Sequence, residues 1–432
     1  MKLFQQMLVA GASLSMLAPV ASQASDVVNL EEMNSYSRSE SKSSILDSKT
    51  FINEVSEDLA ILKGRVDGLE VKQKEFEAGG FSDTTVMDQK VVFDFGAIDY
   101  SENDSTRLNN SSSEAYKFAY SYRMNLNTSF TGDDNMYIRI LSGNHSDWMK
   151  DSNDGGYLTS VGKGNNLQVD KIWYEFPVGE NNTVWVGPKI ENYYMHGTAP
   201  SIYKPVTKQF TLGGNGNAYG ASTDTGAGWA YKADNGFAIS SNIGTKSKTT
   251  SSGKDTGLLT DGSKTSWATQ IGYTQPRYSV SAIVNQKFNG WADGYLHTAS
   301  ADDALVSGGN HTAYGLRGWW RPEETGSATP SISVGYDTTQ YDGVTSGTDS
   351  SDMWFVGLQW ADIINPDDKI GLALAQPTKH DDETTNPFAY ELYYSYKAND
   401  SVTVTPTIFG GTDRDGGTED VFGALIQTTF KF

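Results

Sequence analysis

The chain has 432 residues and a formal net charge of −20, which argues against nucleic acid as a partner. It contains no cysteine, so disulfides, thiolate metal sites and cysteine nucleophiles are excluded together. Hydrophobic residues make up only 37%, whereas glycine (44), tyrosine (23) and tryptophan (10) are abundant. This composition suits a β-barrel with a thin apolar outer band and a wet interior. An array of glycine-rich soluble β-sandwiches is the alternative.

The first 24 residues have the features of a secretory signal peptide. Lys2 supplies a positive charge, residues 7–20 form a short apolar stretch, and residues 22–24 place small side chains at both cleavage-determining positions. The mature chain is therefore expected to begin near Ser25. Residues 25–50 are polar and serine-rich, which predicts a linker.

Residues 51–78 change to a heptad period, which predicts a helix that forms a short parallel coiled coil with neighbouring chains. Opposite charges at the flanking positions, such as Asp58 and Lys63, support this register. A single helix packed on the mouth of the barrel is the alternative. The seam consists of Ile52, Leu59 and Val66 at position a and Val55, Leu62, Leu69 and Phe76 at position d.

From residue 87 to residue 432 the period is two, which predicts an all-β domain. In residues 115–130, the clearest case, Phe118 and Tyr120 alternate with Lys117 and Ala119. No segment has the roughly 18 consecutive apolar residues of a spanning helix. A secreted chain that enters a membrane without helices must close its sheet, because only closure pairs every backbone group in lipid. The domain is therefore predicted to be a transmembrane antiparallel β-barrel of about sixteen strands.

The predicted connections alternate between short and long. TGDD (131–134) and NPDD (365–368) are tight, whereas 144–166 and 191–226 are long. Outer-membrane barrels usually have long loops on the outer side and short turns on the periplasmic side. An even number of strands places both termini in the periplasm. The sixth and seventh strands have the weakest pattern, so fourteen strands remain an alternative. The predicted strands are 87–98, 115–130, 135–143, 167–178, 183–190, 227–233, 236–245, 265–275, 277–289, 311–322, 329–340, 351–363, 369–378, 387–398, 401–410 and 421–432.

Three segments resemble the outer-membrane porins of cyanobacteria, the iron-uptake type related to the carbohydrate-selective porins. They are DLAILKGRVDGLE (58–70), SDTTVMDQKVVFDFGA (82–97) and VDKIWYEFPVGENNTVWVGPKI (169–190). The resemblance implies a pore for small hydrophilic solutes and inorganic ions, iron among them. Together with the coiled coil it implies a homotrimer.

In that family the terminal aromatic residue, here Phe432, presents the signal that the outer-membrane barrel assembly machinery reads. Family members also carry a surface-layer-homology domain before the coiled coil. Residues 25–50 are too few for such a domain, so anchoring to the cell wall is not expected.

The third long loop, 191–226, is the predicted constriction, because sixteen-stranded porins generally narrow the pore with this loop. On the strands, alternation places five basic residues on the lumen side, where they would form a wall opposite the loop. The alternative is scattered charges paired with neighbours such as Asp170 and Glu175. The loop residues are Glu191, Tyr193, Tyr194, His196, Tyr203, Lys204, Lys208 and Tyr219, and the wall residues are Arg123, Arg139, Lys171, Lys189 and Arg317.

The later outer loops are acidic, with residues such as Asp349, Asp381 and Asp413. An acidic vestibule predicts a weak preference for cations, opposed by any basic wall deeper in the pore. A merely hydrated surface is the alternative. The five histidines lack zinc-site spacing, and nothing singles out a serine–histidine pair such as Ser266 with His311. We therefore expect no metal, no cofactor and no enzyme activity.

These observations favour a passive diffusion porin in the outer membrane of a Gram-negative-type, cyanobacterial cell, with its N-terminal segment in the periplasm. The expected partners are outer-membrane lipid, small solutes and ions, and the assembly machinery. A non-conducting barrel that tethers the outer membrane through its coiled coil is the second hypothesis. A barrel-borne hydrolase is the third.

Overall fold

The computed structural model describes most of the chain from residue 84 onward. The described ranges are 84–100, 115–150, 156–159, 162, 164–220, 224–246, 262–298, 309–342, 349–414 and 420–432, together with Lys63, Thr260 and Ala301. The predicted signal peptide and linker lie outside these ranges. So does the predicted coiled coil except for Lys63, and these three assignments stay predictions.

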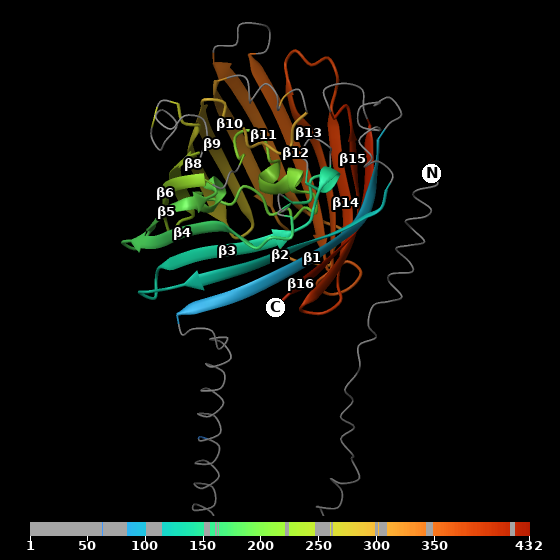
Figure 1. Cartoon of the computed structure of the whole chain (residues 1–432), viewed down its shortest axis with the longest axis horizontal. Coiled ribbons are helices and arrows are strands. Elements are labelled where there is room, and N and C mark those ends of the chain that lie inside the picture. Colours follow the sequence, from blue (N-terminus) through green and yellow to red (C-terminus); the bar gives the residue numbers. More distant parts are fainter. Residues whose placement is uncertain are drawn as a thin grey trace, which may run out of the picture. The chain divides into compact units, whose positions relative to one another are not determined.

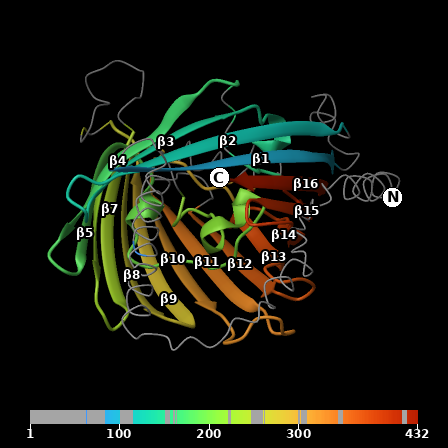
Figure 2. The same cartoon turned by 90° about the horizontal axis from the view of Figure 1, so that it is seen from below.

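Sixteen antiparallel strands close into one barrel (Figures 1 and 2). Each strand pairs with its neighbours in sequence, and β1 pairs with β16 to close the ring. The strands are β1 (Thr85–Tyr100), β2 (Lys117–Thr128), β3 (Asn135–Gly143), β4 (Gln168–Val178), β5 (Asn182–Ile190), β6 (Asp224–Lys232), β7 (Phe237–Thr245), β8 (Thr265–Gln275), β9 (Tyr278–Phe288), β10 (Asn310–Trp320), β11 (Ser331–Asp342), β12 (Ser350–Ala361), β13 (Lys369–His380), β14 (Phe388–Lys397), β15 (Val402–Thr412) and β16 (Val421–Lys431). The predicted fold class and the count of sixteen are confirmed.

The predicted strand boundaries agree closely with the observed ones. The largest difference is at β6, which begins at Asp224 rather than at residue 227. Its first residues, Asp224 to Gly226, are small or polar and give no alternating signal. They enter the sheet through pairing with β7, where Thr225 lies opposite Thr245.

The connections alternate in length most clearly in the first ten strands. The turns 179–181 and 276–277 are short, whereas 144–167, 191–223 and 289–309 are long. Later in the chain the contrast disappears, because 321–330 on the short side exceeds 343–349 on the long side. The predicted asymmetry therefore holds for the part of the barrel that carries the lumen loops.

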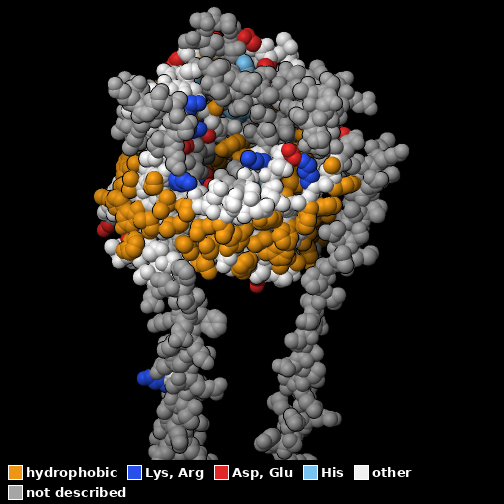
Figure 3. Space-filling model, in the orientation of Figure 1, with side chains coloured by type: hydrophobic (Ala, Val, Ile, Leu, Met, Phe, Trp, Pro, Cys, Tyr) orange, Lys and Arg blue, Asp and Glu red, His pale blue; other side chains and the backbone are white. Residues whose placement is uncertain are grey.

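Alternation separates an apolar outer face from a polar inner face, as a lipid-embedded barrel requires. On β8, Trp267 and Ile271 are 51% and 49% exposed on the outer face. Their sequence neighbours Ser266 and Gln270 point inward and are buried. Figure 3 shows the outward hydrophobic side chains as a continuous band around the barrel face in view. Within the described part of the chain, no helix has the length and apolarity needed to cross a bilayer.

The seam between the first and last strands is sealed on both faces. Outside, the ring of Phe93 contacts those of Phe118 and Phe430 at centroid distances of 5.8 and 5.3 Å. Inside, Gln427 Nε2 donates to Asp94 Oδ1 at 2.8 Å. Aromatic edge-to-face contacts and a part-buried hydrogen bond both stabilise the closed ring.

Candidate functional site

The connection between β5 and β6, residues 191–223, is called the third loop below, and the structure describes it as far as residue 220. It contains two short 3-10 helices, η2 (Asn192–Met195) and η3 (Lys208–Gly213). Figures 1 and 2 show both within the ring of strands rather than above its rim. The loop therefore follows the inward course that the strand count predicts.

The first half of the loop bonds to inward side chains of β8 and β10. The Thr198 amide donates to Gln270 Oε1 at 2.9 Å, and Gln270 Nε2 donates back to the Thr198 carbonyl at 3.0 Å. The Trp319 indole donates to the Ala199 carbonyl at 3.1 Å. These side chains satisfy loop backbone groups that would otherwise be buried without partners.

Glu391 on β14 is the second point of attachment. Its side chain is completely buried. One oxygen accepts from the Tyr203 hydroxyl at 3.0 Å and the Val206 amide at 3.2 Å, and the other accepts from the Thr207 amide at 2.5 Å. A single buried side chain thus holds the turn that leads into η3, through three hydrogen bonds.

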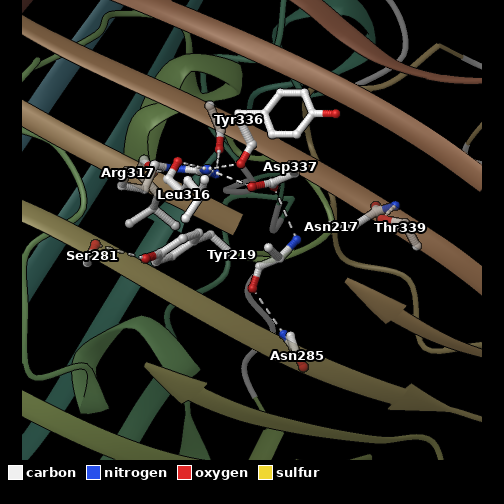
Figure 4. Close-up of polar contacts among 12 residues, drawn as sticks. Asn217, Tyr219, Ser281, Asn285, Leu316, Arg317, Tyr336, Asp337 and Thr339 are labelled. Carbon is white, nitrogen blue, oxygen red and sulfur yellow. Dashed lines mark hydrogen bonds and ion pairs between the residues drawn. The ribbon is translucent and has the colours of Figure 1, made fainter. Parts of the chain in front are cut away.

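Arg317 on β10 is the third point of attachment (Figure 4). Its guanidinium donates to the carbonyls of Leu212 and Gly214, both at 2.9 Å, and to Asp337 on β11 at 2.6 Å. The guanidinium carbon lies 4.5 Å from the centre of the Tyr219 ring. The planar fork of arginine suits this set of acceptors, because it donates in several directions at once.

At this attachment the loop lies against the barrel backbone with no room for a side chain. A Cβ atom on Gly335 would lie 1.9 Å from the Gly213 carbonyl oxygen. Gly213 itself has a φ of 74°, a conformation that glycine adopts at little cost. Further along, Asn217 Nδ2 donates to Thr339 Oγ1 at 3.0 Å (Figure 4).

Two other long loops pack against the third loop. The Lys208 amide donates to the carbonyl of Tyr157 in the 144–167 loop at 2.8 Å, and the amide of Tyr295 in the 289–309 loop donates to the Asn215 carbonyl at 2.7 Å. The rings of Tyr157 and Tyr295 stack at 4.8 Å. The third loop is therefore fixed on both sides.

Two of the predicted wall residues, Arg139 on β3 and Lys171 on β4, lie side by side in register. Arg139 Nε donates to Asp170 at 2.8 Å, and Lys171 forms an ion pair with Glu191 at the start of the third loop. Arg139 Nη2 also lies 3.8 Å from a Glu191 oxygen, so both cations bind the base of the loop to the wall.

Three further cations lie in the same part of the lumen: Lys90 on β1, Arg123 on β2 and Lys208 on the third loop. All three are half-buried. Among the described residues, none of them forms a salt bridge with a carboxylate. Lys208 lies within electrostatic range of the other two and of Arg139. Burial, together with Arg123 and Arg139, lowers the pKa of Lys208 to about 7.

The remaining predicted residues lie elsewhere. Arg317 faces inward as alternation predicts, but the third loop covers it, so it anchors the loop rather than joining the basic wall. Glu175 accepts from the Trp185 indole at 2.8 Å, within the wall. Lys189 sits at an irregularity of β5 and donates to the Val169 carbonyl at 2.8 Å. The Lys204 side chain is exposed, and the backbone carbonyl of Lys204 accepts from the hydroxyl of Tyr393 on β14 at 2.7 Å.

Sequence reasoning did not identify Lys90, Glu391 or Asp337 as site residues. Lys90 stands at an inward position of β1, two residues from Asp88 and four from Asp94, so alternation was an available signal. Glu391 and Asp337 had no comparable signal, because Glu391 accepts from the Thr207 amide, 184 positions away, and Asp337 accepts from the Ala218 amide, 119 positions away.

The histidine and carboxylate side chains in the described part of the chain do not gather into a ligand set. No group of three histidine or carboxylate side chains there could hold a metal ion. His145, in the 144–167 loop, contacts Asp94 of β1 at 2.7 Å near the β1–β16 seam.

The comparisons with known proteins agree with this architecture. The sequence model of the family described as "Carbohydrate-selective porin, OprB family" matches residues 42–432. The uncharacterized protein alr4550 of Nostoc sp. strain PCC 7120 is 24% identical over 423 residues, 88% of this chain and 71% of that protein. The uncharacterized protein sll0772 of Synechocystis sp. is 28% identical over 142 residues, 32% of this chain and 25% of that protein.

Among solved structures, OprB of Pseudomonas putida is similar with a TM-score of 0.57 and 12% identity, over 82% of this chain and 97% of that one. An anion-selective porin from Comamonas acidovorans has a TM-score of 0.52 and 10% identity, over 81% of this chain and 99% of that one. At such identities these similarities concern the fold.

Proposed function

Because the chain belongs to the OprB family of carbohydrate-selective porins, we propose that it forms a water-filled outer-membrane pore for passive diffusion of small hydrophilic solutes, carbohydrates included. The family and the barrel fold indicate the outer membrane, and they are non-enzymatic in general. The observation that carries the proposal is a long loop fixed inside a closed barrel by Gln270, Glu391 and Arg317.

The third loop narrows the lumen from the side of β8 to β14, and the wall formed by β1 to β4 faces it. Solutes would pass between Lys208 on the loop and Arg123 on the wall. Pores of this kind select by diameter and by the charges that line the narrowest part. The polar inner face of the barrel keeps the path hydrated.

Conductance of the purified full-length chain in planar bilayers tests the proposal. Discrete opening steps, together with faster swelling of liposomes in monosaccharide than in trisaccharide, are the expected results. A folded barrel that gives no conductance would favour the tethering hypothesis instead. Ester or peptide hydrolysis that is lost on replacement of one serine would favour the hydrolase.

We also propose that the chain is a homotrimer held by the coiled coil of residues 51–78, with this segment in the periplasm. The heptad pattern supports this, and openings in groups of three that become single after Leu62→Asp would test it. We propose Phe432 as the assembly signal, to be tested by the folded fraction of Phe432→Ala in cells. Iron remains a candidate solute through the family resemblance alone, and uptake of labelled iron by cells with and without the protein would test it.

A further inference from the structure

Four consecutive strands each present a cation to the lumen at neighbouring positions. Arg139 lies opposite Lys171 on the β3–β4 pair, and Asn125 lies opposite Arg139 on the β2–β3 pair. Asn125 Nδ2 also donates to Asp88 Oδ1 at 2.7 Å. On antiparallel strands a shift of two residues keeps the same face, so Arg123 lies beside Lys90. The cations of β1 to β4 therefore form a continuous row.

Lys208 faces this row from the third loop. Its amide is held by the Tyr157 carbonyl at 2.8 Å, and its ammonium lies 5.9 Å from the centre of the Tyr157 ring. The cations that act on the charge of Lys208 are Arg123, Arg139 and Lys90. Positive charge thus lies on both sides of the narrowed lumen.

The carboxylates nearby pair with Arg139 and Lys171 but not with the other three cations of this group. Asp170 is bound to Arg139, and Glu191 is bound to Lys171. Asp94 interacts electrostatically with Lys90, but its two oxygens are occupied by Gln427 and His145. Lys90, Arg123 and Lys208 are therefore gathered without a paired anion among the described residues.

Three half-buried like charges repel one another, and a mobile anion between them would offset that repulsion. Arginine presents two parallel donors that match two oxygens of a phosphate or carboxylate, and lysines add point charges around them. The arrangement is therefore suited to an oxyanion.

We propose that Lys90, Arg123 and Lys208 form a transit site for small oxyanions, so that the pore passes anions in preference to cations. This inference rests on the proposed porin function. It opposes the cation preference expected from the acidic outer loops. Their charges act over about 8 Å at physiological salt, whereas a narrow passage concentrates the field of the charges that line it.

Reversal potentials in a potassium chloride gradient provide the first test. The wild-type chain should show a chloride-to-potassium permeability ratio above unity. Each Lys→Gln or Arg→Gln replacement at the three positions should lower the ratio about twofold, and the triple variant roughly eightfold. Arg277→Gln is the matched control, because it removes one positive charge at an exposed turn where Arg277 pairs with Glu323.

Inorganic phosphate provides the second test, which needs no variant. Millimolar phosphate added to a chloride solution should lower the single-channel current of the wild type, and the triple variant should lose this block. Folding of each variant is verified by the opening of channels and by heat-modifiable mobility on gels.

The outcomes separate the two proposals. Absence of channels in the wild type would overturn the porin function itself. Open channels that prefer potassium, or that phosphate does not block, would overturn the oxyanion site and leave the porin function intact.

Discussion

Replacing Glu391 by alanine should release the middle of the third loop while the barrel stays closed. The carboxylate accepts from Tyr203, Val206 and Thr207, and all four residues are buried. A buried donor left without an acceptor costs about 1–3 kcal/mol, so the three donors together cost about 3–9 kcal/mol. Lumen water can solvate part of the freed segment, and we therefore expect a loss near 3 kcal/mol.

A loss of about 3 kcal/mol raises the population of the detached segment about 100-fold. The Arg317 attachment is untouched, so residues 212–214 stay bound to β10. Larger and noisier single-channel currents are expected, because the passage widens intermittently. Trypsin cleavage after Lys208 should accelerate by up to the same factor, since cleavage of an opened segment follows its population.

Two variants control for this prediction. Glu391→Gln keeps one acceptor oxygen and should give a smaller effect. Glu175→Ala removes another inward glutamate, which accepts from Trp185 and does not contact the third loop, and it should leave the current unchanged. If folded Glu391→Ala shows wild-type current and wild-type cleavage, this carboxylate does not hold the loop.

Three further predictions concern other positions. Gly335→Ala should push the third loop off β11, because the new Cβ would lie 1.9 Å from the Gly213 carbonyl oxygen. A raised channel conductance or a lower folded yield is the expected result. Gly318→Ala is the control and should be neutral, because its Cβ would meet nothing closer than 3.6 Å. The hydroxyl of Tyr174 on β4 donates to the Asp134 carboxylate, and amides and hydroxyls of the turn donate to it as well. These hydrogen bonds, with that of Tyr174 as the largest effect, hold the pKa of Asp134 well below its usual 3.8, against the opposing effect of burial. Its stabilising effect should therefore be complete above pH 4 and lost only as the pH falls further, a dependence of melting temperature that Asp134→Asn should lack. Anion preference should decline as the pH rises through about 7, because burial and the neighbouring arginines lower the pKa of Lys208 to about 7, and Lys208→Gln should reduce that decline.

The barrel could be predicted from the sequence because its strands obey a local rule. Alternation of Trp267 and Ile271 with Ser266 and Gln270 is visible in eleven residues and reflects lipid on one side and water on the other. The start of β6 at Asp224 could not be predicted, since small residues are recruited there by a neighbour rather than by their own pattern.

The candidate site was predictable only in part, for a related reason. Alternation gives the face of Arg123, Lys171 and Arg317 correctly, but it does not tell which of them a loop will cover. Arg317 is covered and Arg123 is not, and the difference depends on where Leu212 and Gly214 lie. Glu391 gave no signal for the same reason, because its partners are distant in the sequence.

The seam between β1 and β16 bears on the order of assembly. The bond between Asp94 and Gln427 joins residues 333 positions apart, and contacts of such separation form slowly because most of the chain must be ordered first. The third loop is attached to β8, β10, β11 and β14, all of which precede the closing strand. Its attachments can therefore form on an open sheet, and the final pairing of β16 with β1 would close the ring around a loop that is already attached.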